Sequence, residues 1–336
     1  MRKQTLGKTG LELSALGFGC VRLTAHSRPE EAIEILNTAY NSGITHFDVA
    51  RLYGFGRAEG ILGQFLKGKR QSVTVATKFG LSPPAGLVGK RWMVNAVKKA
   101  LGPFPGLLRV AKRRASQKVE TGVFSPAAAQ QSLETSLREL GTDYVDLLLL
   151  HECSIADATN PELLAMLQRQ IAAGKVRSVG VASEFGKLPP DAALLADFLQ
   201  IIQFNHNAQS RNLPRWRNVE SRGIVTHSIF GPARPLAEAI RARPELARRF
   251  SSDLNLDLSD PLVINSLLLH YNLQSNAGGA VLFSSTDAAH VKANARSVDS
   301  DHYDQRQISG FIDFVDQMLG SGAPSNLQAT DLDPVR

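Results

Sequence analysis

Residues 125–151 read SPAAAQQSLETSLRELGTDYVDLLLLH and contain a complete helix–turn–strand unit. After a Ser-Pro start, leucines recur at helical spacing, which predicts a helix over Ser125–Leu140 that stops at Gly141. The run Tyr144–Leu150 is almost continuously apolar and predicts a strand buried on both faces, as in a parallel sheet. A helix followed by such a strand is the repeating unit of α/β folds.

The same alternation extends over most of the chain. Apolar runs predict eight strands, at Ala15–Cys20, Ile44–Val49, Ser72–Thr77, Tyr144–Leu150, Val176–Val181, Leu199–Phe204, Gly223–Ser228 and Gly279–Phe283. Helical patterns are predicted at Pro29–Asn41, Ser125–Leu140, Pro161–Ala173, Pro189–Phe198, Leu213–Arg222, Pro261–Gln274 and Ala288–Ser297. Eight similar units favour a single (β/α)8 TIM barrel, an α/β fold. The alternative is a doubly wound open sheet with a second domain.

The chain has 336 residues, and the barrel is expected to occupy residues 1–320 as one domain. Two regions exceed its needs: an insertion at 84–123, between the third strand and the third helix, and a second at 232–259. Residues 321–336 are rich in Gly, Pro, Ser, Asn and Asp and predict a flexible tail.

Composition narrows the class of protein. With 43% hydrophobic and 21% charged residues, the chain is typical of a globular protein, which excludes wholesale disorder. Two cysteines, Cys20 and Cys153, cannot build a disulfide framework. No window of about 18 apolar residues occurs, and the first residues lack the apolar stretch of a secretory signal. We therefore expect a cytoplasmic protein without stable membrane association.

The net charge of +7 originates in one segment. Residues 84–118 hold nine Lys and Arg and no Asp or Glu, so the remainder of the chain carries a net charge of −2. One hypothesis is a helical lid or wall that attracts an anionic substrate or the phosphates of a cofactor. The alternatives are a solvated cover without a partner and a peripheral membrane contact. Only Trp92 and Phe104 interleave with the basic residues, so no nucleic-acid partner is predicted.

Chemistry in such a barrel occurs where the strands end on their C-terminal side. Asp48 ends the second predicted strand, Tyr53 lies in the loop after it, and Lys78 and His151 follow the third and fourth strands. Each has an ordinary explanation when taken alone, such as a helix cap, a packing ring, a solvated strand end or a core histidine. Together on one rim, these four side chains predict a catalytic site.

The four groups fit one reaction. A free tyrosine has a pKa near 10, too high for efficient proton transfer near neutrality. An ammonium at about 4 Å attracts a phenolate by roughly 4 kcal/mol at an effective dielectric constant near 20, so we expect Lys78 to lower the pKa of Tyr53. Asp48 would keep Lys78 charged and in place, and His151 would orient a carbonyl oxygen.

These motifs resemble the aldo-keto reductase superfamily. The resemblance lies in the segment from Asp48 to Gly54 (DVARLYG), in Thr-Lys78 and Leu-Leu-His151, and in SLETSLRELGTDYVDLLLLH at 132–151. The opening, LGKTGLELSALGFGCVRL, resembles the family's N-terminal β-hairpin and first strand. Membership implies reversible NAD(P)H-dependent reduction of an aldehyde or ketone to an alcohol. In that reaction Tyr53 is the general acid and base.

The resemblance also suggests cofactor contacts. Gln203 matches the family's nicotinamide-binding Gln, and Ser183 belongs to the pair that stands where the family usually has Ser-Asn. His227 stands where the family commonly has a stacking Tyr, and Ser228 follows it. No metal site is predicted.

The adenosine end departs most from the family pattern. Ser284, Ser285 and Asn294 match positions of the family's NADP signature, but its Lys and Arg are absent. NADP is therefore the cofactor implied by resemblance, and NAD is a genuine option. These departures also keep open an alternative function, a cofactor-binding regulatory barrel with little turnover.

Overall fold

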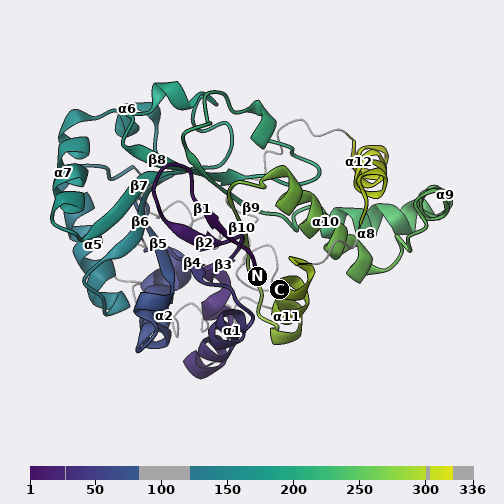
Figure 1. Cartoon of the computed structure of the whole chain (residues 1–336), viewed down its shortest axis with the longest axis horizontal. Coiled ribbons are helices and arrows are strands. Elements are labelled where there is room, and N and C mark those ends of the chain that lie inside the picture. The colour runs from purple at the N-terminus through teal and green to yellow at the C-terminus, as the bar shows by residue number, and fades with distance from the viewer. Residues whose placement is uncertain (27, 83–121, 300–302, 321–336) are drawn as a thin grey trace, which may run out of the picture.

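The structure is a computed structural model that describes residues 1–26, 28–82, 122–299 and 303–320 (Figure 1). Its centre is a closed barrel of eight parallel strands in the order β10-β3-β4-β5-β6-β7-β8-β9. The strands are β3 (Leu16–Gly19), β4 (His46–Asp48), β5 (Thr74–Phe79), β6 (Val145–His151), β7 (Val176–Ala182), β8 (Leu199–Asn205), β9 (Gly223–His227) and β10 (Ala280–Phe283). Closure confirms the (β/α)8 prediction and excludes the open sheet.

Helices surround the barrel (Figure 1). Those in the described residues are α1 (Pro29–Asn41), α2 (Ala58–Leu66), α5 (Pro126–Leu140), α6 (Ile155–Ala158), α7 (Pro161–Ala172), α8 (Ala233–Ala242), α9 (Pro244–Leu254), α10 (Pro261–Ser275), α11 (Ala288–Ser297) and α12 (Gln305–Leu319). The start and stop signals act as expected in α5, where Ser125 accepts a hydrogen bond from the Ala128 N–H and Gly141 ends the helix at φ 64°.

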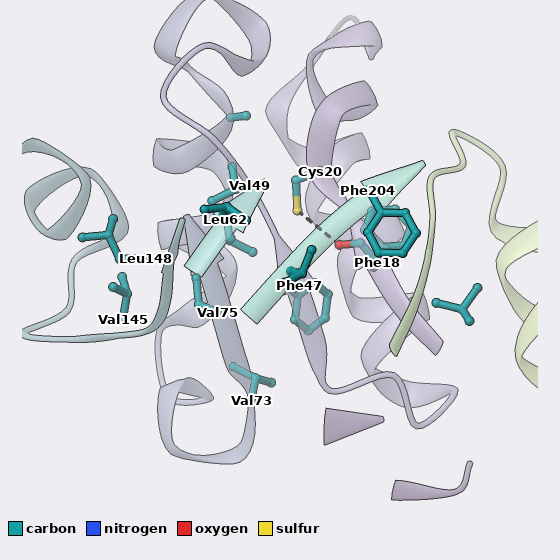
Figure 2. Close-up of a cluster of buried hydrophobic side chains, with 14 of the residues drawn as sticks. Phe18, Cys20, Phe47, Val49, Leu62, Val73, Val75, Val145, Leu148 and Phe204 are labelled. Carbon is teal, nitrogen blue, oxygen red and sulfur yellow. Dashed lines mark hydrogen bonds between the residues drawn. The ribbon is translucent and has the colours of Figure 1, made fainter. Parts of the chain in front are cut away.

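Side chains alternate between the barrel interior and the surrounding helices. Figure 2 shows the outward set, in which Phe47 and Val75 on neighbouring strands pack beside Leu62 of α2. In the same cluster the Cys20 thiol donates a weak hydrogen bond to the Phe18 carbonyl. This layer of aromatic and branched side chains joins the strands to the helices around them.

A β-hairpin closes one end of the barrel. Strands β1 (Lys3–Thr5) and β2 (Glu12–Ser14) pair antiparallel, as the resemblance predicted. Leu6, Leu11 and Leu13 of this hairpin join the buried cluster formed by interior side chains of the barrel. The hairpin leads directly into β3, so it plugs the N-terminal end of the strands and leaves the C-terminal end for chemistry.

Two predicted helices are wrong. Segments 189–198 and 213–222 contain only the short 3-10 turns η4 (Ala192–Leu194) and η5 (Leu213–Arg215). The two segments pair with each other instead: the Ala192 N–H donates to the Arg217 carbonyl at 3.0 Å, and the Arg217 N–H donates to that of Pro190 at 3.0 Å. These hydrogen bonds give partners to some of the backbone N–H and C=O groups, which would form hydrogen bonds within each segment if it were a helix.

The second insertion, 232–259, forms α8 and α9, which pack with α12 beside the barrel (Figure 1). Phe250, Phe311 and Phe314 belong to a separate hydrophobic cluster there. Residues 84–121 of the basic insertion (84–123) and the predicted tail (321–336) lie outside the described residues. Within the part of the chain that the structure describes, no helix is long and apolar enough to cross a membrane.

Candidate active site

The candidate site is the last interior layer of the barrel. The apolar layer below it belongs to one buried cluster with the N-terminal hairpin and includes Ala76, Leu149, Ile201, Val225 and Leu282. Interior positions recur every two residues along a strand, so the next layer lies two residues further on in each strand. That step leads to Lys78, His151, Gln203, His227 and Ser284. The alternation of the strands thus brings these five predicted residues to one rim.

The centre of this layer is a buried ion pair. Lys78 Nζ donates to Asp48 Oδ1 and also to the Val49 carbonyl at 3.2 Å. Asp48 and Lys78 are each only 3% exposed. The same ammonium lies 3.5 Å from the Tyr53 hydroxyl, so one lysine contacts both the carboxylate and the phenol. The structure therefore brings together three of the four predicted catalytic residues.

Gln203 completes the partners of the carboxylate. Its Nε2 donates to Asp48 Oδ2 at 2.9 Å, and the side chain is 2% exposed. Each oxygen of Asp48 thus has a partner, which restricts rotation of the carboxylate. Gln203 was predicted only as a cofactor contact; here it also orients Asp48.

Lys78 lowers the pKa of Tyr53, as expected, but the net shift of that pKa is upward. Burial raises the pKa of the Tyr53 hydroxyl above its ordinary value of 10, and the Lys78 ammonium offsets only part of that effect. For Lys78 itself, burial opposes the charge, but Asp48 and Tyr53 outweigh it and raise the pKa. The site in this state therefore holds a neutral phenol beside a charged ammonium.

His151 is the fourth predicted catalytic residue. Its ring packs edge-on against Tyr53, with centroids 6.1 Å apart. Burial and the positive charge of Lys78 hold the pKa of His151 well below 6.5, so the imidazole is neutral near pH 7. Its Nδ1 is buried without a hydrogen-bond partner among the described residues.

The nicotinamide-side predictions fall on the neighbouring strand ends. The Ser183 N–H donates to the Gln203 carbonyl at 3.0 Å, which places this buried serine beside Gln203. His227 is half-buried, and its Nδ1 lies 2.9 Å from the exposed Ser228 hydroxyl. A buried hydroxyl next to a primary amide matches the donors and acceptors of a carboxamide, so the residues present fit a nicotinamide ring.

Two of the residues predicted to contact the adenosine already form hydrogen bonds within the protein. Ser284 donates to the Gly19 carbonyl at 2.7 Å across the junction of β10 and β3, and Ser285 exchanges hydrogen bonds with the backbone of Asp287. Asn294 lies half-buried on α11. Both serine hydroxyls are therefore already engaged in hydrogen bonds to the backbone.

Two features escaped the sequence analysis. Asp287 caps α11 by accepting from the N–H groups of Ala289 and His290, a cap that the pattern Ser-Thr-Asp before a helix signals. Glu59, fully buried on α2, pairs with Arg51 and with Thr77. That arrangement depends on the tertiary fold and leaves no local signal. Among the residues described, no group of three or more His, Cys, Asp or Glu side chains is placed to hold a metal ion.

Comparison with known proteins agrees with this geometry. Residues 15–188 match the model of the Aldo/keto reductase family. A probable aldo-keto reductase 1 of Glycine max is 30% identical over 184 residues, 53% of this chain and 43% of its own length. The chain spans about half the length of the curated relatives it matches.

Solved structures share the whole barrel. The holo form of the aldo-keto reductase AKR11C1 from Bacillus halodurans superimposes with a TM-score of 0.70 at 22% identity, covering 94% of this chain and 96% of that one. An aldo-keto reductase from Klebsiella pneumoniae in complex with NADPH gives 0.66 at 19% identity, covering 96% and 97%. At such identities the likeness shows the fold, whereas the family model matches the sequence over the strands that carry Asp48, Lys78 and His151. The chain belongs to the aldo/keto reductase family.

Proposed function

We propose that this protein is a nicotinamide-dependent oxidoreductase that interconverts an aldehyde or ketone with the corresponding alcohol. The observation that carries the proposal is the contact of one buried ammonium, Lys78, with both Asp48 and the Tyr53 hydroxyl. A bound NAD(P)H supplies hydride to the carbonyl carbon in this chemistry. The residues of the chain supply the proton and the orientation.

Tyr53 is the proposed proton donor to the carbonyl oxygen. Its raised pKa keeps the hydroxyl protonated near pH 7, so the acid is present before each reduction. When the proton leaves, the Lys78 ammonium 3.5 Å away stabilises the phenolate. Asp48 holds that ammonium charged and in place. In the oxidative direction the same phenolate takes the proton back from the alcohol.

His151 positions the carbonyl. Since its imidazole is neutral, it donates a hydrogen bond from one ring nitrogen without competing with Tyr53 as an acid. The ring lies edge-on to Tyr53, so a carbonyl oxygen bound between them is held at the phenol. Ser183, Gln203, His227 and Ser228 would hold the nicotinamide.

We further propose a preference for NAD(H). Phosphate groups bind in TIM barrels at the loops after the seventh and eighth strands, next to a helix N-terminus. Here the N-terminus of α11 is already capped by the Asp287 carboxylate, beside Ser284 and Ser285 and without Lys or Arg at the family positions. A second negative group at this point is repelled, which disfavours a 2′-phosphate. Asn294 remains a proposed contact of the adenosine.

The basic segment at 84–118 lies outside the described residues, and its role is proposed from sequence alone. If it attracts an anionic substrate, the KM for an anionic aldehyde should rise with salt while that for a neutral aldehyde stays constant. Neutralising Lys112, Arg113 and Arg114 should abolish the difference. A KM independent of salt for both substrates would contradict this role.

The decisive test replaces Tyr53 with Phe, which removes only the hydroxyl. We expect kcat for aldehyde reduction to fall by about 10²- to 10⁴-fold, while the Kd for NADH stays within about twofold. Tyr40→Phe is the matched control, because that hydroxyl bonds only Ser72 at the surface among the contacts described. Near-normal turnover in Tyr53→Phe contradicts the mechanism. Cofactor binding by the wild type without hydride transfer to a broad aldehyde panel would favour the regulatory alternative.

A further inference from the structure

The loop that carries Tyr53 has an unfavourable backbone. Directly after Tyr53, the residues Gly54, Phe55 and Gly56 all have positive φ angles, of 59°, 57° and 83°. A Cβ atom at Gly54 would lie 2.2 Å from the Thr24 side chain, so only glycine fits there. Phe55 pays the usual steric cost of the left-handed region, and such conformations persist only where the surroundings enforce them.

A buried carboxylate lies between this loop and the barrel. Glu59, on the first turn of α2, is 0% exposed. One of its oxygens accepts from the Arg51 guanidinium, which precedes Tyr53 by two residues in the same loop. The other accepts from the Thr77 hydroxyl at 2.7 Å, and Thr77 directly precedes Lys78 on β5. One side chain therefore connects the segment that holds the phenol to the strand that holds the ammonium.

The contact between Lys78 and Tyr53 depends on how the loop is held against β5, because the contact is long. Lys78 Nζ and the Tyr53 hydroxyl are 3.5 Å apart, at the limit of a hydrogen bond. A small displacement of the loop relative to β5 is enough to separate them. Resting on the proposed function, we infer that Arg51, Glu59 and Thr77 form a brace that positions Tyr53 against Lys78, with Glu59 as the positioning residue.

The main variant is Glu59→Gln, tested in the full chain without ligand. The amides of Tyr53 and Phe55 donate to the carbonyls of Ala50 and Leu52 at 3.0 and 3.2 Å, so their hydrogen exchange reports on the loop. We expect exchange in residues 50–57 to accelerate by about 10-fold or more. The kcat for aldehyde reduction should fall by about 10-fold, with the aldehyde KM within about twofold, because Glu59 does not touch the substrate.

The matched control is Asp146→Asn. Asp146 is also a fully buried carboxylate, paired with Arg70 and Arg177 at 2.7 and 2.8 Å, and it accepts from the Val75 N–H at 2.8 Å. It lies next to the start of β6, at the end of the barrel remote from the site. This variant should lower the melting temperature comparably but leave both kcat and the exchange of residues 50–57 within about twofold of the wild type.

Two further variants test the brace if the Glu59→Gln protein does not fold. Thr77→Val removes one hydroxyl at nearly constant volume and should change exchange and kcat in the same direction. The double variant Arg51→Gln/Glu59→Gln removes both charges of the pair, so it should regain stability without regaining loop protection.

The brace is overturned if exchange in 50–57 stays at the wild-type rate in these variants, or rises equally in Asp146→Asn. If the wild type reduces no aldehyde, the proposed function fails. The exchange measurement still decides the brace, because it is made on the protein without ligand.

Discussion

Asp48 and Lys78 are each other's partner in the barrel interior. Taking either charge out of water is costly, and their mutual attraction together with the bonds from Gln203 and to Val49 offsets that cost. At the scale of the residue, this pair links stability and chemistry. A change to one member leaves the other buried and alone.

Replacing Asp48 with Asn should therefore lower the free energy of unfolding by about 3–5 kcal/mol, as measured by urea denaturation. The double variant Asp48→Asn/Lys78→Met removes both charges and should recover most of that loss while remaining inactive. A single variant as stable as the wild type would show that the pair contributes no stability. Recovery of activity in the double variant would contradict the role of Lys78.

The rates of carbonyl reduction and alcohol oxidation should depend differently on pH. The raised pKa of Tyr53 keeps the acid protonated, so kcat for reduction should be flat from about pH 6 to 9. Oxidation needs the phenolate, so its rate should rise about tenfold per pH unit over the same range. No inflection is expected near pH 6.5, because the pKa of His151 lies well below that value. An inflection near pH 6.5 in the plot of kcat for reduction against pH would contradict a neutral His151.

At the scale of the element, the N-terminus of α11 sets the proposed cofactor preference. Asp287→Ser removes the carboxylate but keeps a good N-cap, so helix stability should hardly change. In fluorescence titrations, the Kd for NADPH should fall by about 5- to 10-fold and that for NADH by less than about twofold. Asp260→Ser, which alters the equivalent cap of α10, is the control. If the ratio of the NADPH and NADH Kd values does not change, the 2′-phosphate does not bind at the N-terminus of α11.

Elements were predictable where the signal is local. The Ser125 cap and Gly141 stop defined α5, and the apolar runs located the strands within a few residues. Segments 189–198 and 213–222 failed because their backbone groups are satisfied by each other, a tertiary effect. No helix was assigned to 58–66 or 305–319, yet the latter opens with a capping box, Asp304 and Gln307, that the sequence does contain.

The same division applies to the candidate site. Strand ends meet on one rim in any such barrel, so the sequence was enough to identify Asp48, Lys78 and His151. The pKa direction of Tyr53 was not, because burial depends on every element packed around the loop. Glu59 lies shortly after the segment from Asp48 to Gly54, but its partner Thr77 comes from β5, distant in the sequence.

At the scale of the whole molecule, stability should decline in mild acid. His46 and His206 are buried, and burial lowers the pKa of each to about 4. The unfolded chain binds protons at these two residues below about pH 6.5, whereas the folded protein does so only near pH 4, so stability falls as pH decreases between these values. These two histidines together contribute up to about 2.7 kcal/mol per pH unit to the slope. The lowered pKa values of His151 and His227 act in the same direction, whereas Glu184, whose pKa burial raises to about 7, opposes them.

Urea denaturation at several pH values between 4.5 and 7 measures this slope. His46→Gln should reduce it by up to about 1.4 kcal/mol per pH unit, because one proton is then no longer taken up on unfolding. The His46 ring nitrogen Nδ1 is 2.9 Å from the Thr74 hydroxyl, and the Gln amide offers a similar partner. A slope unchanged by this substitution would assign the acid sensitivity to other groups.

The junction of β10 with β3 has a consequence for how the protein is made. Val281 pairs with Leu16, and Ser284 bonds Gly19 across 265 residues of sequence. During synthesis on the ribosome, β3 therefore emerges long before its last neighbour and waits with one edge unpaired. Such an edge is a site for mispairing between nascent chains. When β10 pairs with β3, it closes the barrel and covers the unpaired edge of β3.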